Sequence, residues 1–189
     1  MTIAITGATG HFGRLVVSKL KEKIPSDNII ALARSVEKAK DLKVEAREFD
    51  YEKPAILKPA LKGVDTLLLI SASELGKRYS QHKNIIEAAK GTGIKWIVYT
   101  SLLHDDNSSL DIAAEHEATE KLLKESGIPL TVLRNGWYTE NYTNLVPGAI
   151  RNGTFLGCAG NGKISGAARE DYADAAVAVL VGKGHQGKT

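Results

Sequence analysis

The feature that most constrains the fold is a glycine-rich turn near the N-terminus. Residues 7–13 read Gly-Ala-Thr-Gly-His-Phe-Gly, directly after the short apolar run from Ile3 to Thr6 and before a segment of helical periodicity from Phe12 to Lys23. Glycines at this spacing permit a tight turn, a close approach of backbone N–H groups to a pyrophosphate, and close packing of helix on strand. Strand, turn and helix in this order predict a dinucleotide-binding unit, and a plain tight turn is the alternative.

Strand-like and helix-like segments alternate along the chain. Short apolar runs typical of buried strands lie at 29–33, 44–49, 66–70, 96–100 and 130–133. Segments with apolar residues three or four apart lie at 81–93, 113–126 and 172–181, and a glycine-rich stretch at 148–166 predicts loops. Because parallel strands need long crossovers, we expect one α/β domain over residues 1–189, with a Rossmann-type doubly wound parallel sheet and helices on both faces.

Composition excludes several classes of protein. The 189 residues carry a formal net charge of +3 with no long basic run, so nucleic acid is not an expected partner. Cys158 is the only cysteine, which excludes an internal disulfide and a multi-cysteine metal site and favours a reducing compartment, the cytoplasm. No apolar run approaches the length of a membrane span, and we expect neither a membrane segment nor a bound metal.

Arg34 bears on the choice of cofactor. It ends the second apolar run, where NAD-binding domains carry an acidic residue that holds the ribose 2′-hydroxyl. A guanidinium instead makes charge-assisted hydrogen bonds to a 2′-phosphate, so the sequence favours NADPH over NADH. The alternatives are that Arg34 is a solvated charge, or that Lys38 takes this role.

Four motifs carry a resemblance to a known family. They are the glycine turn with Ala33-Arg34, and the segments 69–76, 99–104 and 133–142. Together they resemble the NmrA-like group of atypical short-chain dehydrogenases, within it the bacterial NADPH:quinone oxidoreductases, and they are also similar to triphenylmethane reductases. The resemblance implies a Rossmann domain that binds NADPH and passes hydride to a quinone without a flavin. Family members continue past the position of Thr189 into a part that covers the substrate, so we expect this chain to be truncated.

The resemblance also implies the cofactor-binding residues. The pyrophosphate would lie on Gly7, Ala8, Thr9, Gly10, His11 and Phe12, and the 2′-phosphate on Arg34. The nicotinamide side of the cleft would be lined by Ser73, Glu74, Leu75 and Gly76. The site would be completed by Tyr138, Thr139, Glu140, Asn141, Tyr142, Thr143 and Arg169.

The residues themselves leave alternatives open at these places. Ser71 to Gly76 follow the fourth predicted strand, where ligands bind, but they also suit an ordinary strand-to-helix loop. Asp50 and Tyr51 would contact an adenine or form a solvated turn. The rings of Trp137, Tyr138 and Tyr142 would stack on a flat ligand or pack in the core, and Arg169 would contact the cofactor or pair with the acids that follow it.

The proton donor of most short-chain dehydrogenases is missing. They place a tyrosine and, four residues later, a lysine after the fifth strand, whereas this chain has Ile112 and His116 there. His116 is a weak candidate for a catalytic role, and its alternative is a solvated helix residue beside Glu117 and Glu120. The same spacing at Tyr79 and Lys83 lies in the wrong helix and is interpreted as chance.

This absence disfavours ketone reduction more than quinone reduction, because a reduced quinone anion takes its proton from water. The expected partner is a quinone-like small molecule, and a homodimer is left open. Two alternative functions remain: a redox sensor that binds NADP without turnover, and a reductase of triphenylmethane or azo dyes. Thr100, Ser101 and His104, at the end of the fifth strand, would orient the substrate or cap a turn.

Overall fold

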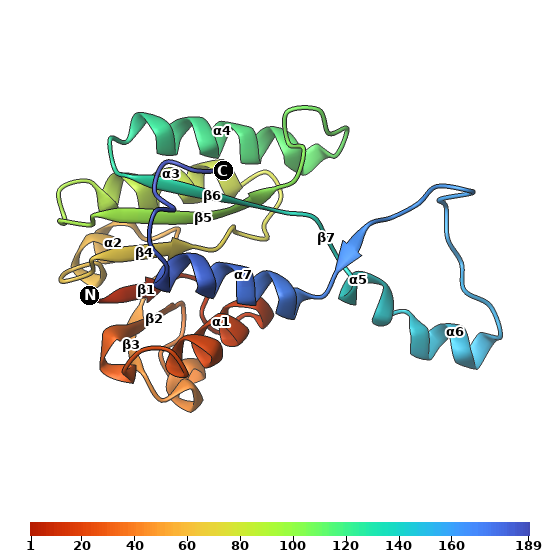
Figure 1. Ribbon diagram of the computed structural model, residues 1–189, viewed down its shortest axis with the longest axis horizontal. Helices are drawn as coiled ribbons and strands as arrows, with labels where there is room; N and C mark the ends of the chain where they lie inside the picture. The colour runs from red at the N-terminus through yellow and green to blue at the C-terminus, as the bar shows by residue number, and fades with distance from the viewer.

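The centre of the computed structural model, which describes residues 1–189, is a six-stranded parallel sheet in the order β3-β2-β1-β4-β5-β6 (Figure 1). The strands are β1 (Ile3–Ile5), β2 (Ile29–Ala33), β3 (Glu45–Glu48), β4 (Thr66–Leu69), β5 (Trp96–Leu102) and β6 (Leu130–Asn135). The chain order reverses between β1 and β4, which is the switch point where open α/β sheets bind ligands. The expected Rossmann-type parallel sheet is confirmed.

Helices cover both faces of the sheet and create two cores. One core lies under α1 (His11–Lys21) and α7 (Arg169–Val181), and the other lies under α2 (Pro54–Ala60), α3 (Arg78–Ala89) and α4 (Asp111–Glu125). The residues of β1, β2 and β4 are all buried, as expected for strands covered on both faces. Their continuous apolar runs, rather than an alternating pattern, follow from this double coverage.

Several short elements were not expected from the sequence. They are the 3₁₀ helices η1 (Ser26–Asn28) and η2 (Glu37–Leu42), together with helix α2. Pro54 begins α2, where a backbone N–H would have no acceptor within the helix, so proline costs no hydrogen bond there. Pro59 lies inside this short helix. A pattern this short offers too few turns for periodicity to be recognised.

Residues 137–167 form an arm that extends from the domain. It comprises β7 (Trp137–Tyr138), α5 (Glu140–Thr143), α6 (Val146–Asn152) and the returning strand β8 (Gly166–Ala167), which pairs in parallel with β7. Figure 1 shows the arm projecting to one side of the sheet. Every residue from 150 to 166 is exposed. The expectation of loops at 148–166 is wrong at its start, where α6 continues to Asn152, and at Gly166, which begins β8; the residues between them form the outer part of the arm.

After α7, the chain returns to the edge of the sheet. The Gly187 amide donates to the carbonyl of Leu130 at 2.7 Å, and the Val132 amide donates to the carbonyl of Lys188 at 3.0 Å. None of the helices combines the length and the apolar character needed to cross a bilayer.

Candidate functional site

A cleft of about 1050 Å³ lies at the carboxyl ends of the strands, over the switch point between β1 and β4. Its walls come from the glycine turn, the ends of β2 and β3, the loop after β4, and the beginning of the arm and of α7. The residues predicted to hold a cofactor that line this cleft are Gly7, Thr9, Gly10, His11, Phe12, Arg34, Ser73, Glu74, Tyr138 and Arg169. The fold thus brings segments far apart in sequence to one hollow of dinucleotide size.

The glycine turn fits a pyrophosphate. Gly7 has φ +58, which favours glycine, and a Cβ on Gly13 would lie 2.3 Å from the Gly7 carbonyl oxygen. Helix α1 can therefore begin directly against β1. No side chain caps α1 and its first turn holds no acidic residue, so its N–H groups and its dipole are available to an anion. Ala8 is buried beneath the turn and does not line the cleft.

Charged side chains of both signs gather where a 2′-phosphate would lie, and the acids Glu37 and Asp41 stand among the bases. Arg34 is exposed, and its Nη1 is 3.5 Å from Oε1 of Glu74. Lys38 and Lys40 also line this end of the cleft. The resemblance placed Glu74 on the nicotinamide side, whereas the structure places its carboxylate beside Arg34, the residue that follows β2. Glu74 therefore forms a weak, exposed ion pair with Arg34, and a bound phosphate would replace Glu74 as the partner of Arg34.

The wall beside this end presents three polar groups to the cleft. Asp50 and Tyr51 both line it, and burial raises the pKa of Tyr51 to about 12, so the phenol stays protonated. The Asp50 carboxylate also accepts a hydrogen bond from the Glu52 amide at 3.1 Å, so it stabilises the turn as well as lining the cleft. Gln81, which the sequence did not single out, lines the cleft with its Oε1 buried and without a hydrogen-bond partner.

The opposite end of the cleft is closed by Tyr138 and Arg169. The Tyr138 ring stacks on Phe12 with centroids 6.5 Å apart and an interplanar angle of 13°, and Cζ of Arg169 lies 4.8 Å from the centre of the Tyr138 ring. The Arg169 amide donates to both oxygens of Glu140, at 2.9 and 3.0 Å. Arg169 does not pair with the acids that follow it.

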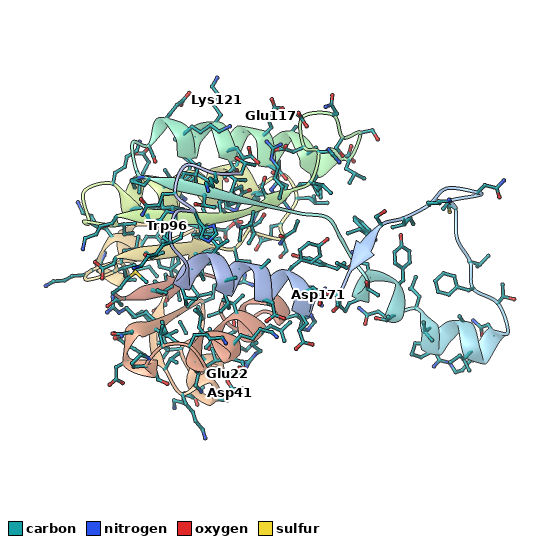
Figure 2. The ribbon with its side chains drawn as sticks, viewed as in Figure 1. Glu22, Asp41, Trp96, Glu117, Lys121 and Asp171 are labelled. Atoms are coloured by element: carbon teal, nitrogen blue, oxygen red, sulfur yellow. The ribbon has the colours of Figure 1, made fainter.

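Those two acids have other partners. Glu170 pairs with Lys19 at 3.1 Å, and Asp171 accepts from the Ala168 amide at 3.2 Å at the start of α7, where Figure 2 labels it. The Arg169 guanidinium is therefore left facing the cleft.

The other residues predicted for the cofactor site do not line the cleft. They are Leu75, Gly76, Thr139, Glu140, Asn141, Tyr142 and Thr143. The last five belong to the root of the arm, in and around α5, which runs away from the sheet (Figure 1). Trp137 is exposed and also lies outside the cleft lining. Of the three aromatic rings singled out, only Tyr138 reaches the cleft.

The structure does not place His116 in the cleft. It is 5% exposed, and its Nδ1 lies 2.8 Å from the hydroxyl of Tyr99, which is itself fully buried. Burial, and then the charge of Arg78, lowers the pKa of His116 to about 4. Figure 2 shows Glu117 and Lys121 on the outer face of α4. The contact with Tyr99 of β5 places His116 on the face of α4 that packs against the sheet. His116 is therefore neither the catalytic residue nor the solvated helix residue that the sequence suggested; it is a buried, neutral histidine.

A second buried polar cluster fixes the loop after β5. Arg134 donates to Glu120 from Nε at 3.1 Å and from Nη2 at 2.8 Å, and Nη2 lies 3.2 Å from Asp105. Burial and the neighbouring Glu120 raise the pKa of Asp105, and Arg134 helps keep Glu120 ionised. The cluster joins β6, α4 and the loop that begins at Leu103. Because it lies outside the cleft lining, we assign it a structural role.

Comparison with known proteins agrees with this geometry. The chain is 51% identical to quinone oxidoreductase 2 of Escherichia coli (strain K12) over 98% of its length, which corresponds to 66% of that protein. The crystal structure of the E. coli NADPH-dependent quinone oxidoreductase complexed with NADPH superimposes with a TM-score of 0.95, covering 99% of this chain and 67% of that one. The triphenylmethane reductase of Citrobacter sp., complexed with NADP(H), is 37% identical with a TM-score of 0.96, covering 100% of this chain and 68% of that one.

These likenesses confirm the resemblance stated from the motifs. The chain spans about two thirds of the length of these relatives. A family model described as NAD(P)H-binding matches residues 7–182, which is nearly the whole chain. The chain therefore belongs to the NAD(P)H-binding family.

Proposed function

We propose that the protein to which this chain belongs is an NADPH-dependent oxidoreductase that transfers hydride directly to a quinone, without a flavin. The observation that carries the proposal is the glycine turn facing Arg34 across one cleft, in a chain 51% identical to a quinone oxidoreductase. The turn supplies backbone donors for a pyrophosphate, and Arg34 supplies a charge for the 2′-phosphate that distinguishes NADPH from NADH.

Each end of the cleft has residues suited to one part of the cofactor. Residues 7–12 would hold the pyrophosphate, with Ala8 acting through the backbone fold of the turn. Arg34, assisted by Lys38 and Lys40, would hold the 2′-phosphate. Tyr138 and Arg169 would border the nicotinamide end. The roles of Leu75, Gly76 and residues 139–143 stay predictions, because they lie outside the cleft lining.

The reaction suits a site without a tyrosine and lysine pair. NADPH, when bound, supplies a hydride from its nicotinamide ring. The protein contributes proximity, orientation and exclusion of water, and the stacked pair of Phe12 and Tyr138 gives that end a flat apolar border. No buried acid faces this end of the cleft, and a quinone needs none because its reduced anion is protonated by water.

The direct test is anaerobic oxidation of NADPH by a simple benzoquinone with the full-length protein. We expect turnover with NADPH, at least tenfold weaker use of NADH, and a rise of about 10- to 100-fold in the KM for NADPH in Arg34→Ala, because a charge-assisted contact is lost. Arg151→Ala is the matched control, since Arg151 is an exposed arginine on α6 outside the cleft. Equal use of NADPH and NADH would overturn the cofactor assignment.

The same assay separates two other candidates. The likeness to triphenylmethane reductase favours a dye as acceptor, so decolourisation of a triphenylmethane dye is measured in parallel. Firm NADPH binding without turnover of either acceptor would indicate a redox sensor instead. A homodimer and a cytoplasmic location stay predictions.

A further inference from the structure

The loop after β4 is held from behind by side chains of three different elements. Its three consecutive amides, of Ile70, Ser71 and Ala72, donate to Thr6 Oγ1 at 2.9 Å, Thr100 Oγ1 at 3.0 Å and His82 Nε2 at 2.9 Å. The acceptors come from the end of β1, from β5 and from α3. Residues 70–74 all line the cleft, so this row of hydrogen bonds sets the shape of one wall.

The bond from Ala72 fixes the protonation state of His82. Because Nε2 accepts a hydrogen bond, the ring proton must lie on Nδ1, which donates to Thr119 Oγ1 at 3.0 Å. The Thr119 hydroxyl in turn donates to the carbonyl of Glu115 at 2.7 Å. His82 is fully buried, and burial, followed by the charges of Arg78 and His116, lowers its pKa to about 3. The imidazole is therefore neutral at physiological pH.

The carbonyl of Ala72 is held by a buried arginine. Arg78 Nε donates to it at 2.8 Å, and Arg78 Nη1 pairs with Glu115 at 2.8 Å, with side chains only 6% and 18% exposed. Both polar groups of Ala72 are thus held by side chains of α3, which are braced in turn by α4. Buried charge and a buried neutral imidazole are expensive, and here both converge on a single residue of the cleft wall.

We propose that His82 and Arg78 are positioning residues of the cofactor cleft: by holding the amide and the carbonyl of Ala72, they set Ala72 and Ser73 against the ligand. The identity of that ligand rests on the proposed function, whereas the loop geometry does not. His82 lies between Tyr79 and Lys83, in the segment whose spacing was interpreted as chance. Its role depends on an acceptor at the position of Nε2, and the ring needs no exchange of protons.

The test compares two substitutions in the full-length protein. Gln places an oxygen where Nε2 lies, so His82→Gln retains an acceptor for Ala72, whereas His82→Leu removes it at similar volume. We expect the Ala72 amide to exchange with solvent at least about tenfold faster in His82→Leu, with near-normal exchange in His82→Gln, because a buried donor is left unpaired only in the former. The Ile70 amide, held by Thr6, is the internal control.

Binding of NADPH supplies the functional measurement. The Kd should rise about tenfold in His82→Leu and recover to within about threefold of wild type in His82→Gln. Should His82→Leu fail to fold, Thr119→Val, which removes the acceptor of Nδ1–H, replaces it and should accelerate exchange at Ala72 in the same direction. Equal Ala72 exchange in wild type and His82→Leu, or faster exchange with unchanged Kd, would overturn the proposal. Wild-type protein that fails to bind NADPH would instead overturn the proposed function, and the exchange result would still report on the loop.

Discussion

The two walls of the cleft are built in different ways. The wall at residues 7–13 is shaped by backbone alone, with Gly7 in a left-handed conformation and Gly13 in contact with the carbonyl of Gly7. The wall at residues 70–74 contains no glycine, and its amides are held by side chains distant in sequence, including Thr100 and His82. The first wall depends on the absence of side chains, and the second depends on three of them. Acid and mutation should therefore damage the two walls differently.

The largest effect should come from acid, which protonates two buried histidines: His82, which holds the side-chain wall, and His116 beside it on α4. The pKa values of His82 and His116 are lowered to about 3 and about 4, so the unfolded state binds more protons than the native state below pH 6.5. The stability that these neutral rings contribute is complete above pH 6.5 and is lost as the pH falls toward 4. Between pH 7 and pH 5 we expect a loss of about 3 to 4 kcal/mol for the two groups, measured by urea unfolding.

The double variant His82→Gln with His116→Gln is the control for this pH dependence. It removes both titrating groups, so its stability should change much less between pH 7 and pH 5, even if it is lower overall. The raised pKa of Asp105 acts in the opposite direction and is retained in the variant. An equally steep loss in the variant would show that other groups are responsible.

Substitution of Gly13 should break the backbone wall. In Gly13→Ala the new Cβ would lie 2.3 Å from the Gly7 carbonyl oxygen and 2.8 Å from Cα of Ala8, so α1 must move away from β1. We expect a loss of about 2 to 3 kcal/mol in the free energy of unfolding and at least a 100-fold rise in the Kd for NADPH. Gly148→Ala is the matched control, because that helical glycine has room for a methyl group and should keep full affinity. Retained NADPH affinity in Gly13→Ala would contradict the role of the turn.

A smaller effect is expected from Thr100, which holds the middle amide of the side-chain wall. Thr100→Val keeps the shape of the side chain but leaves the Ser71 amide without an acceptor, at a cost of about 1 to 2 kcal/mol in the free energy of unfolding. Thr100→Ser retains the hydroxyl and should recover most of that loss. Thermal unfolding of the two variants side by side measures the difference, and equal melting temperatures would argue that the hydrogen bond is unimportant.

The smallest effect should come from the contact that joins the two sides of the cleft mouth. Glu74→Gln removes a carboxylate 3.5 Å from Arg34, so NADPH should bind about twofold more tightly at low salt, and NADH binding should not change. Glu87→Gln, which removes an acid paired with Lys90 at 2.8 Å outside the cleft, is the control. Weaker NADPH binding in Glu74→Gln would indicate that Glu74 itself contacts the cofactor.

The contrast between the walls also explains what the sequence could predict. The glycine turn and the strands could be predicted because each is a local pattern in the sequence. Strand β2, for example, lies at the predicted residues. The hydrogen bond between His82 and Ala72 could not be predicted from the sequence, because it depends on how α3 packs against β5. The sequence signal for the side-chain wall was the presence of polar residues, such as Thr6 and Thr100, at the ends of apolar strands. Only Thr100 was considered as a site residue.

Three predicted parts of the site lie elsewhere in the structure than their place in the sequence suggested, and for the same reason. His116 was considered for catalysis because it stands where most short-chain dehydrogenases have the lysine of their catalytic pair, but α4 turns it toward Tyr99. Glu74 was assigned to the nicotinamide side, but the path of the loop brings it to Arg34. Residues 139–143 lie outside the cleft lining because β7 leads them into the arm, and their contact with the cofactor stays a prediction. Sequence spacing identifies which residues carry chemistry, and packing decides where their side chains lie.

The central claim is that this cleft binds NADPH and selects it through Arg34. Its most direct test is calorimetric titration of the full-length protein with NADPH and with NADH under identical salt conditions. We predict that NADPH binds at least tenfold more tightly, and that Arg34→Ala abolishes the difference by weakening NADPH alone. Equal affinities in the wild-type protein, or a preference that survives in Arg34→Ala, would contradict the assignment of this site.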